Sequence, residues 1–273
     1  MKKFLFSFLS LSLVLSLICS CNGKSGFSSD ASDSISFDSI KTDSTLFITE
    51  DTAGPRCHIN LSIVYAKGKN AENINDSIIR SGILSPDYLS LSSEKISIPQ
   101  AVDSFVSRYM AEYKKVYTEL YKADKGHGSF YVCEYDVRTQ VTQENDKYYT
   151  YQANIYNYGG GAHGNSIVVV KNIDVETGKI ITLKDLFVPG FEHELNGLIV
   201  KNLCEKFDAK DLKELNDKAV FMGIDVYPSE NFIVGKKSIT FIYSPDEIAF
   251  HAAGEIRVEI NNSDIENLLK KQK

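Results

Sequence analysis

The run with the strongest chemical pattern is Gly-Gly-Gly-Ala-His-Gly at residues 159–164, directly after a strand-like segment that ends at Tyr158. It contains a formal G-x-G-x-x-G, which in dinucleotide-binding proteins opens a helix whose N-terminus holds the pyrophosphate. Here residues 166–170 (Ser-Ile-Val-Val-Val) follow, and this composition favours a strand. A phosphate-binding loop would also need a lysine where Asn165 stands. The pattern therefore predicts a loop without nucleotide chemistry.

His163 lies between glycines of this loop, which allow the backbone to adopt positive φ or to approach another segment closely. Two interpretations stay open. The ring either fixes the loop through backbone hydrogen bonds, which is the favoured interpretation, or it faces a ligand or a reacting group. If the loop faces a ligand, the candidate residues are Tyr158, Gly159, Gly160, Gly161, His163 and Asn165.

Other catalytic patterns are incomplete. His193-Glu194 begins like the zinc motif H-E-x-x-H, but Gly197 occupies the position of the second histidine. No G-x-S-x-G nucleophile elbow is present. Cys57 and His58 are neighbours on a strand-like segment, where successive side chains point to opposite faces. We therefore expect no catalytic group, no metal site, no cofactor and no enzymatic activity.

The N-terminus has the pattern of an export signal. Two lysines precede an apolar and serine-containing run over residues 4–18, which is too short to span a bilayer stably. Its end resembles a bacterial lipobox, with Ile18 at −3, Ser20 at −1 and Cys21 as the acylated residue. We predict a lipoprotein signal peptide over 1–20 and a lipid anchor on Cys21, which leaves the mature chain extracytoplasmic and attached to the cell envelope.

The mature chain begins with a segment rich in serine and aspartate. Over residues 21–54 there is little apolar surface to offset the entropy of ordering, so we predict a flexible acidic tether. The formal net charge of −6 becomes −8 once Lys2 and Lys3 leave with the signal. An acidic surface disfavours nucleic acid and favours basic partners.

Three cysteines remain beyond Cys21, so at most one disulfide can join them. Cys57 and Cys133 are the candidate pair, and Cys204 would be left over. Three buried thiols are the favoured outcome.

The rest of the chain predicts an α+β fold, with antiparallel sheets, packed helices and two subdomains over 55–164 and 165–273. A helix over 99–122 would place six apolar residues on one face, as part of the core: Val102, Phe105, Tyr109, Tyr113, Val116 and Leu120. Capping boxes predict further helix starts at Ser244 and Ser263. The other expected elements are strands over 58–65, 130–142, 147–158, 167–175, 232–234, 238–243 and 255–260, and helices over 73–83 and 192–207.

Several motifs follow one another in a recognisable order. They are Tyr-Gly-Gly-Gly-Ala-His-Gly at 158–164, Asp-Val-Glu-Thr-Gly-Lys at 174–179, Leu-Lys-Asp-Leu-Phe at 183–187 and Ser-Pro-Asp-Glu-Ile-Ala at 244–249. This order resembles the paired extracytoplasmic domains of RsiV-type anti-sigma factors and PdaC-type polysaccharide deacetylases. The chain departs from both, because it has no sigma-binding segment and no deacetylase domain.

The resemblance implies a non-catalytic recognition module of the cell envelope. RsiV-type proteins use the corresponding region to bind lysozyme, so the expected partner is a basic protein such as lysozyme, or a wall glycan, with the membrane contacted through the lipid anchor. Two alternatives stay open: a non-catalytic subunit of a surface lipoprotein complex, and an envelope-polymer hydrolase that uses His163.

Overall fold

A computed structural model describes residues 34–88, 94–124 and 128–271, all within one compact unit. The predicted signal peptide over 1–20 and the lipidation site Cys21 lie outside the described residues. Among the helices of the described ranges, none is long and apolar enough to cross a membrane.

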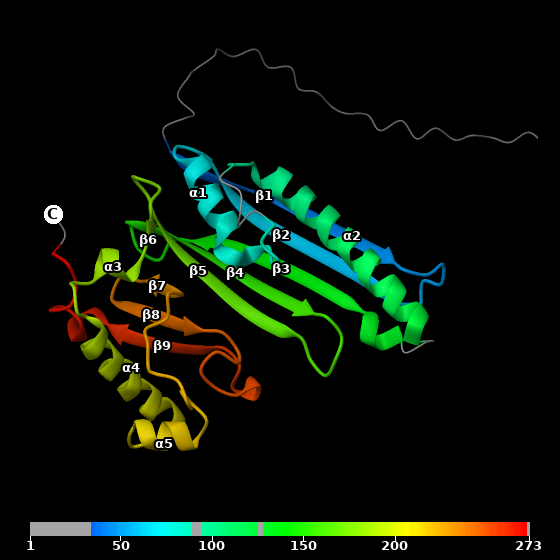
Figure 1. Ribbon diagram of the computed structural model, residues 1–273. Helices are drawn as coiled ribbons and strands as arrows, with labels where there is room; N and C mark the ends of the chain where they lie inside the picture. Colours follow the sequence, from blue (N-terminus) through cyan, green and yellow to red (C-terminus); the bar gives the residue numbers. More distant parts are fainter. Residues whose placement is uncertain (1–33, 89–93, 125–127, 272–273) are drawn as a thin grey trace, which may run out of the picture. The chain divides into compact units, whose positions relative to one another are not determined.

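The larger of two sheets has six strands in the order β1-β2-β3-β4-β5-β6 (Figure 1). Only β2 and β3 run parallel, and the other neighbours are antiparallel. Their bounds are Ile35–Phe47 for β1, Arg56–Gly68 for β2, Cys133–Thr142 for β3, Tyr148–Tyr158 for β4, Asn165–Asp174 for β5 and Ile180–Ile181 for β6.

The parallel pair requires a long crossover, because its two strands begin at the same end of the sheet. The crossover contains α1 (Ala71–Ile78), a π-helical turn (Ile79–Ile83) and α2 (Ile98–Asp124). In Figure 1, α1 and α2 lie over the same face of the sheet. Val102 and Phe105 of α2 are buried there with apolar side chains of β2, β3 and β4, which forms the first hydrophobic core.

The second sheet is antiparallel, in the order β7-β8-β9, and α4 packs against it. Leu195, Ile199 and Leu203 recur every four residues along α4 and are fully buried in a second core. The bounds are Leu183–Leu186 for α3, Glu192–Phe207 for α4, Leu212–Asp217 for α5, Phe232–Val234 for β7, Ser238–Tyr243 for β8 and Ile256–Asn261 for β9.

Hydrogen bonds join an edge of β5 to residues in and beside the second sheet. The backbone N–H of Val168 donates to Ser244 Oγ at 3.0 Å, and that of Val170 donates to Asn231 Oδ1 at 2.9 Å. The buried Asn172 side chain donates to the carbonyl of Phe232 at 2.7 Å. These bonds satisfy backbone and side-chain polar groups that burial would otherwise leave unpaired.

The predicted fold class is confirmed, since helices pack on mainly antiparallel sheets around two cores. The predicted subdomain boundary at 164/165 does not fit, because it separates β4 from β5, which pair over ten positions from Tyr148↔Asp174 to Asn157↔Asn165. The chain leaves the first sheet only after β6, so the first subdomain extends to about Ile181.

The flexible tether predicted over 21–54 is wrong for residues 35–47, which form β1. Serine and aspartate dominate this segment, but Ile35, Phe37, Ile40 and Leu46 contact the first core. Backbone pairing with β2 over thirteen positions supplies the order that composition alone could not.

Two predicted helix starts are also wrong. At Ser244 the capping contact exists, because its N–H donates to Glu247 Oε2 at 2.7 Å. The helix does not propagate, since Asp246 is left-handed at φ 65° and the Ser244 hydroxyl is used by β5. After Ser263, the backbone of Leu268 and Lys270 pairs with Val188 and Leu186, which holds this segment outside a helix.

The three cysteines of the described chain are free thiols. Cys57 and Cys133 are register partners on β2 and β3, but they are not bonded, and both are buried. Burial and the neighbouring Cys133 raise the pKa of Cys57 to about 12, so its thiol stays protonated and inert. Cys204 is only half-buried.

Candidate functional site

A cleft of about 590 Å³ lies between the C-terminal half of α2 and the ends of β3, β4 and β5. We call it the tyrosine cleft. Its lining consists of Pro86, Tyr88, Tyr109, Glu112, Tyr113, Val116, Tyr117, Cys133, Asn157, Gly159, His163, Gly164 and Asn165.

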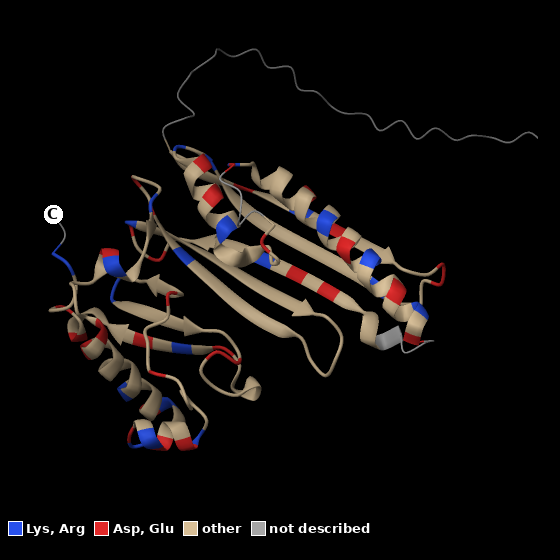
Figure 2. Cartoon of the chain, viewed as in Figure 1, with Lys and Arg blue, Asp and Glu red and all other residues tan. Residues whose placement is uncertain are grey.

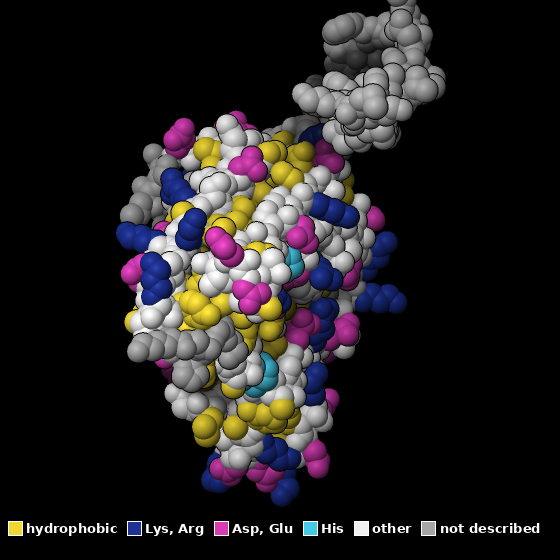
Figure 3. Space-filling model, turned by 90° about the vertical axis from the view of Figure 1, so that its right-hand side faces the viewer, with side chains coloured by type: hydrophobic (Ala, Val, Ile, Leu, Met, Phe, Trp, Pro, Cys, Tyr) yellow, Lys and Arg dark blue, Asp and Glu magenta, His cyan; other side chains and the backbone are white. Residues whose placement is uncertain are grey.

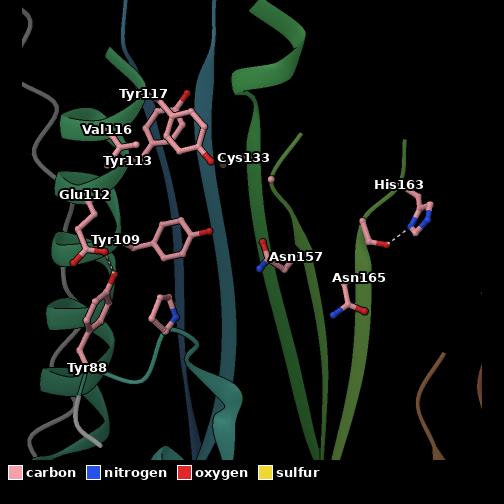
Figure 4. A pocket seen from close by; sticks show the side chains of 13 residues that line it. Tyr88, Tyr109, Glu112, Tyr113, Val116, Tyr117, Cys133, Asn157, His163 and Asn165 are labelled. Atoms are coloured by element: carbon pink, nitrogen blue, oxygen red, sulfur yellow. Dashed lines mark hydrogen bonds between the residues drawn. The ribbon is translucent and has the colours of Figure 1, made fainter. Parts of the chain in front are cut away.

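One wall of the cleft is aromatic because α2 repeats an aromatic residue every four positions. Phe105 is buried in the core, and Tyr109, Tyr113 and Tyr117 continue the same stripe toward the cleft. The rings of Tyr113 and Tyr117 stack with centroids 4.9 Å apart, and Tyr109 contacts Phe105 at 5.4 Å. Figure 4 shows these rings projecting from one side of α2. The stripe therefore changes from core to cleft lining along the helix.

Hydrogen bonds fix the tyrosine hydroxyls. Tyr113 donates to the carbonyl of Tyr131 at 2.6 Å, and Tyr88 donates to Glu112 Oε2 at 2.9 Å. Burial, helped by the bond to Glu112, raises the pKa of Tyr88 to about 12. Burial also raises the pKa of Tyr109 and of Tyr113 well above the usual value. The cleft therefore presents neutral, oriented rings, with no phenolate nucleophile among them.

The facing wall is polar and comes from β4, β5 and the loop between them. Asn157 and Asn165 are register partners on these strands, and both amides border the cleft (Figure 4). Of the residues predicted to face a ligand, Gly159, His163 and Asn165 line the cleft. Tyr158, Gly160 and Gly161 do not, and the Tyr158 hydroxyl donates to the carbonyl of Gly161 at 3.0 Å.

The glycines of the loop serve close packing. Gly160 has φ 86°, and a β-carbon there would collide with the carbonyl oxygen of Phe130. A β-carbon at Gly164 would collide with the ring of Tyr156. In contrast, Gly159 has open space around it. The pattern that formally matched a nucleotide loop is thus explained by backbone shape.

His163 is oriented by the loop and by a second histidine. Its Nδ1 lies 3.1 Å from the carbonyl oxygen of Gly164, and its ring stacks on His251 with centroids 4.3 Å apart. His251 Nδ1 in turn lies 2.7 Å from Asp246 Oδ2. In Figure 4 the His163 ring lies at the far margin of the cleft, away from the tyrosines. His163 therefore contacts a backbone carbonyl and the ring of His251. The carboxylate of Asp246 contacts His251 and not His163.

Over the described ranges, no group of three or more histidine, cysteine, aspartate or glutamate side chains could hold a metal ion. The titratable groups among the described residues of the cleft lining are Glu112, His163, Cys133 and the tyrosines. Burial raises the pKa of the Cys133 thiol, although the hydrogen bond from Tyr117 partly opposes this. These groups suit binding better than nucleophilic attack.

A second surface is apolar and has acidic residues in the same chain segments. Met222 is 67% exposed and Phe250 is 52% exposed, and Ile224 and Tyr227 accompany them. The two segments adjoin, because Phe221 N donates to the carbonyl of Ile248 at 2.7 Å. Asp225, Asp246 and Glu247 lie in the same segments. We call this surface the apolar patch; Figure 3 shows hydrophobic side chains gathered near the lower end of that view.

Periodicity predicted that the whole stripe on α2 belongs to the core. This is confirmed for Val102, Phe105 and Tyr113. It is wrong for Val116 and Leu120. Val116 is 51% exposed and Leu120 is 48% exposed. The tyrosines at 109, 113 and 117 could have indicated a cleft, because tyrosine combines an apolar ring with a polar hydroxyl. Nothing in the sequence indicated that Tyr88 and Glu112 belong to one site, because Tyr88 lies before α2 in the chain and reaches Glu112 only through the tertiary fold.

Comparison with known families confirms the predicted resemblance. Residues 184–263 match the model described as "Protein of unknown function (DUF3298)", and residues 52–166 match the model described as "Deacetylase PdaC". The chain therefore combines a PdaC-like region with a DUF3298 region, the pairing that the motifs predicted. No curated protein matches the chain.

Two crystal structures share the fold. A DUF3298-family member from Bacteroides fragilis is 24% identical, with a TM-score of 0.76, and the match covers 88% of this chain and 96% of that one. A DUF3298-family protein from Pseudomonas aeruginosa is 15% identical, with a TM-score of 0.59, and the match covers 86% and 95%. At these identities the likeness establishes the architecture alone.

Proposed function

We propose that this chain is a lipid-anchored, extracytoplasmic recognition module of the cell envelope that binds a wall glycan in the tyrosine cleft and performs no catalysis. The export signal and lipobox support the location, and the paired domains support a recognition role. The cleft supplies the ligand class.

The composition of the two walls carries this proposal. A sugar ring has apolar C–H faces and a rim of hydroxyl groups. The partly exposed rings of Tyr109 and Tyr117 offer a surface for such faces, with the buried Tyr113 stacked on Tyr117. The amides of Asn157 and Asn165 offer donors and acceptors for the rim. Ligand pockets commonly combine a mainly apolar lining with a few placed polar groups.

Calorimetric titration of the chain lacking residues 1–21 with short β-1,4-linked amino-sugar oligomers tests the proposal. We expect saturable binding that Tyr109→Ala reduces by about tenfold or more, because truncation of a buried aromatic anchor costs about 2 kcal/mol. Tyr65→Ala, in β2, is the matched control, since Tyr65 does not line the cleft. Equal loss in both variants, or no binding by the parent chain, would contradict the proposal.

A lysozyme-like basic protein is a second candidate partner, favoured by the apolar patch and by the formal net charge, which moves from −6 to −8 once Lys2 and Lys3 leave with the signal. Titration with a basic lysozyme at low salt and at 0.15 M salt separates a specific interface from charge attraction alone. If the apolar patch is the interface, binding survives the higher salt, and Met222→Lys abolishes it without changing oligosaccharide binding. Binding that disappears on adding salt would leave the glycan as the remaining candidate.

A further inference from the structure

The tyrosine cleft has an uneven charge. Among the described residues that line it, Glu112 is the only Asp, Glu, Lys or Arg. Glu112 Oε2 accepts the Tyr88 hydroxyl at 2.9 Å, whereas Oε1 has no hydrogen-bond or ion-pair partner among the described contacts. Glu112 lines the cleft, and its carboxylate keeps lone pairs that can accept a hydrogen bond from a ligand.

Two arginines outside the described lining act on its tyrosines, and each already has a partner. Arg108 lies over the ring of Tyr88, with its guanidinium carbon 5.7 Å from the ring centroid. The positive charge of Arg56 partly opposes the rise in the pKa of Tyr113, and Arg56 also pairs with Glu134 at 3.8 Å. Figure 2 shows both signs of charge along α2, and acidic residues on β3. An anionic ligand would thus meet Glu112 with no lysine or arginine among the described lining residues to offset it.

Aromatic rings beside a carboxylate form a favourable environment for an ammonium group, because the ring faces are electron-rich. The contact of Arg108 with Tyr88 shows that one of these rings already binds a cation on one side. We infer that the tyrosine cleft recognises an amino-sugar unit with a free, protonated amine, held between the tyrosine rings and the Glu112 carboxylate. The inference rests on the proposed glycan-binding function and specifies its ligand class.

The test compares two trimers in calorimetric titrations of the chain lacking residues 1–21, at pH 6 and 0.15 M salt. One is the fully N-acetylated β-1,4-glucosamine trimer, and the other is the same trimer without acetyl groups. We expect the free-amine trimer to bind about tenfold more tightly, the scale of a partly desolvated cation–π contact with a carboxylate nearby. Nα-acetyl-lysine amide, which carries an ammonium without a sugar, should bind at least tenfold more weakly than this trimer.

Two variants separate charge from shape. Glu112→Gln keeps the acceptor for Tyr88 but removes the charge, so it should weaken the free-amine trimer about fivefold and leave the N-acetylated trimer unchanged. Arg108→Gln is the matched control on the same helix, and it should not weaken the free-amine trimer. Thermal transitions of both variants should match the parent, because Glu112 and Arg108 are exposed.

Equal or tighter binding of the N-acetylated trimer would overturn this inference and leave the proposed glycan-binding function standing. Binding of the lysine derivative as tight as that of the free-amine trimer would overturn the assignment to a sugar. Failure of both trimers to bind would overturn the inference together with the proposed function.

Discussion

The two long helices of this chain cover their sheets with different side chains. On α4 the buried stripe is aliphatic, with Leu195, Ile199 and Leu203 fully enclosed over the three-stranded sheet. On α2 the stripe begins in the same way but continues as Tyr109, Tyr113 and Tyr117, and a cleft opens along that half. A closed core and a ligand-sized cleft thus follow from the same four-residue spacing, and the choice of side chain distinguishes them.

The largest expected change in the free energy of unfolding is in the closed core under α4. Leu203→Ala in α4 should lower the free energy of unfolding by about 2–5 kcal/mol, because a fully buried side chain leaves a cavity. Val116→Ala on α2 should cost about 0.5 kcal/mol or less, since Val116 is half exposed beside the cleft. Urea denaturation measures both. Similar losses would mean that the two helices cover their sheets equally well.

The next effect concerns the loop that forms the opposite wall of the cleft. Gly160→Ala should destabilise the chain by about 1–3 kcal/mol, because it places a β-carbon at positive φ and against the Phe130 carbonyl. Gly159→Ala is the matched control, with open space and no positive φ, and should change stability by about 0.5 kcal/mol or less. Thermal unfolding distinguishes the two. If Gly160→Ala were also neutral, the loop would not depend on this close approach.

The smallest effect is a pH dependence at the start of the second core. Burial alone would raise the pKa of Asp185, but hydrogen bonds from Lys179 and Thr182 outweigh it and lower the pKa to about 2. A carboxyl whose folded pKa is lowered stabilises the fold above its unfolded pKa, and this contribution is lost as pH falls toward the folded value. Asp185→Asn should therefore be less stable than the parent at neutral pH.

The difference between Asp185→Asn and the parent should shrink as the pH falls from about 4 to about 2, where the parent loses its own carboxylate. Denaturant midpoints at several pH values measure it. A constant difference over this range would show that the capping box, in which Asp185 accepts from Thr182 N at 2.9 Å, does not depend on the charge.

Strong local patterns predicted much of this fold. The helix over 192–207 and the hairpin strands over 232–234 and 238–243 match their observed bounds, because period and turn residues agree there. β1 was missed, since its order comes from thirteen positions of pairing with β2 and its composition resembles a tether. Capping at Ser244 predicted a helix, but the hydroxyl is diverted to the edge of β5, a contact between residues 76 positions apart.

The candidate site was less predictable than the fold. The glycine–histidine loop was singled out, and Gly159, His163 and Asn165 do line the cleft. The core assignment of the tyrosines holds for the buried Tyr113 but missed that Tyr109 and Tyr117 also face a cleft. Periodicity identifies the face of a helix but not what covers it. Glu112 and Tyr88 meet only through tertiary structure, with a hydrogen bond across 24 positions of sequence.

The most direct test of the central claim is one calorimetric comparison of the parent chain and Tyr109→Ala, each titrated with an amino-sugar oligomer. If the tyrosine half of α2 is a binding wall, the parent binds saturably and Tyr109→Ala loses about tenfold or more in affinity while remaining folded. Unchanged affinity in a folded Tyr109→Ala, or no binding by the parent, would contradict the assignment of this cleft as the recognition site.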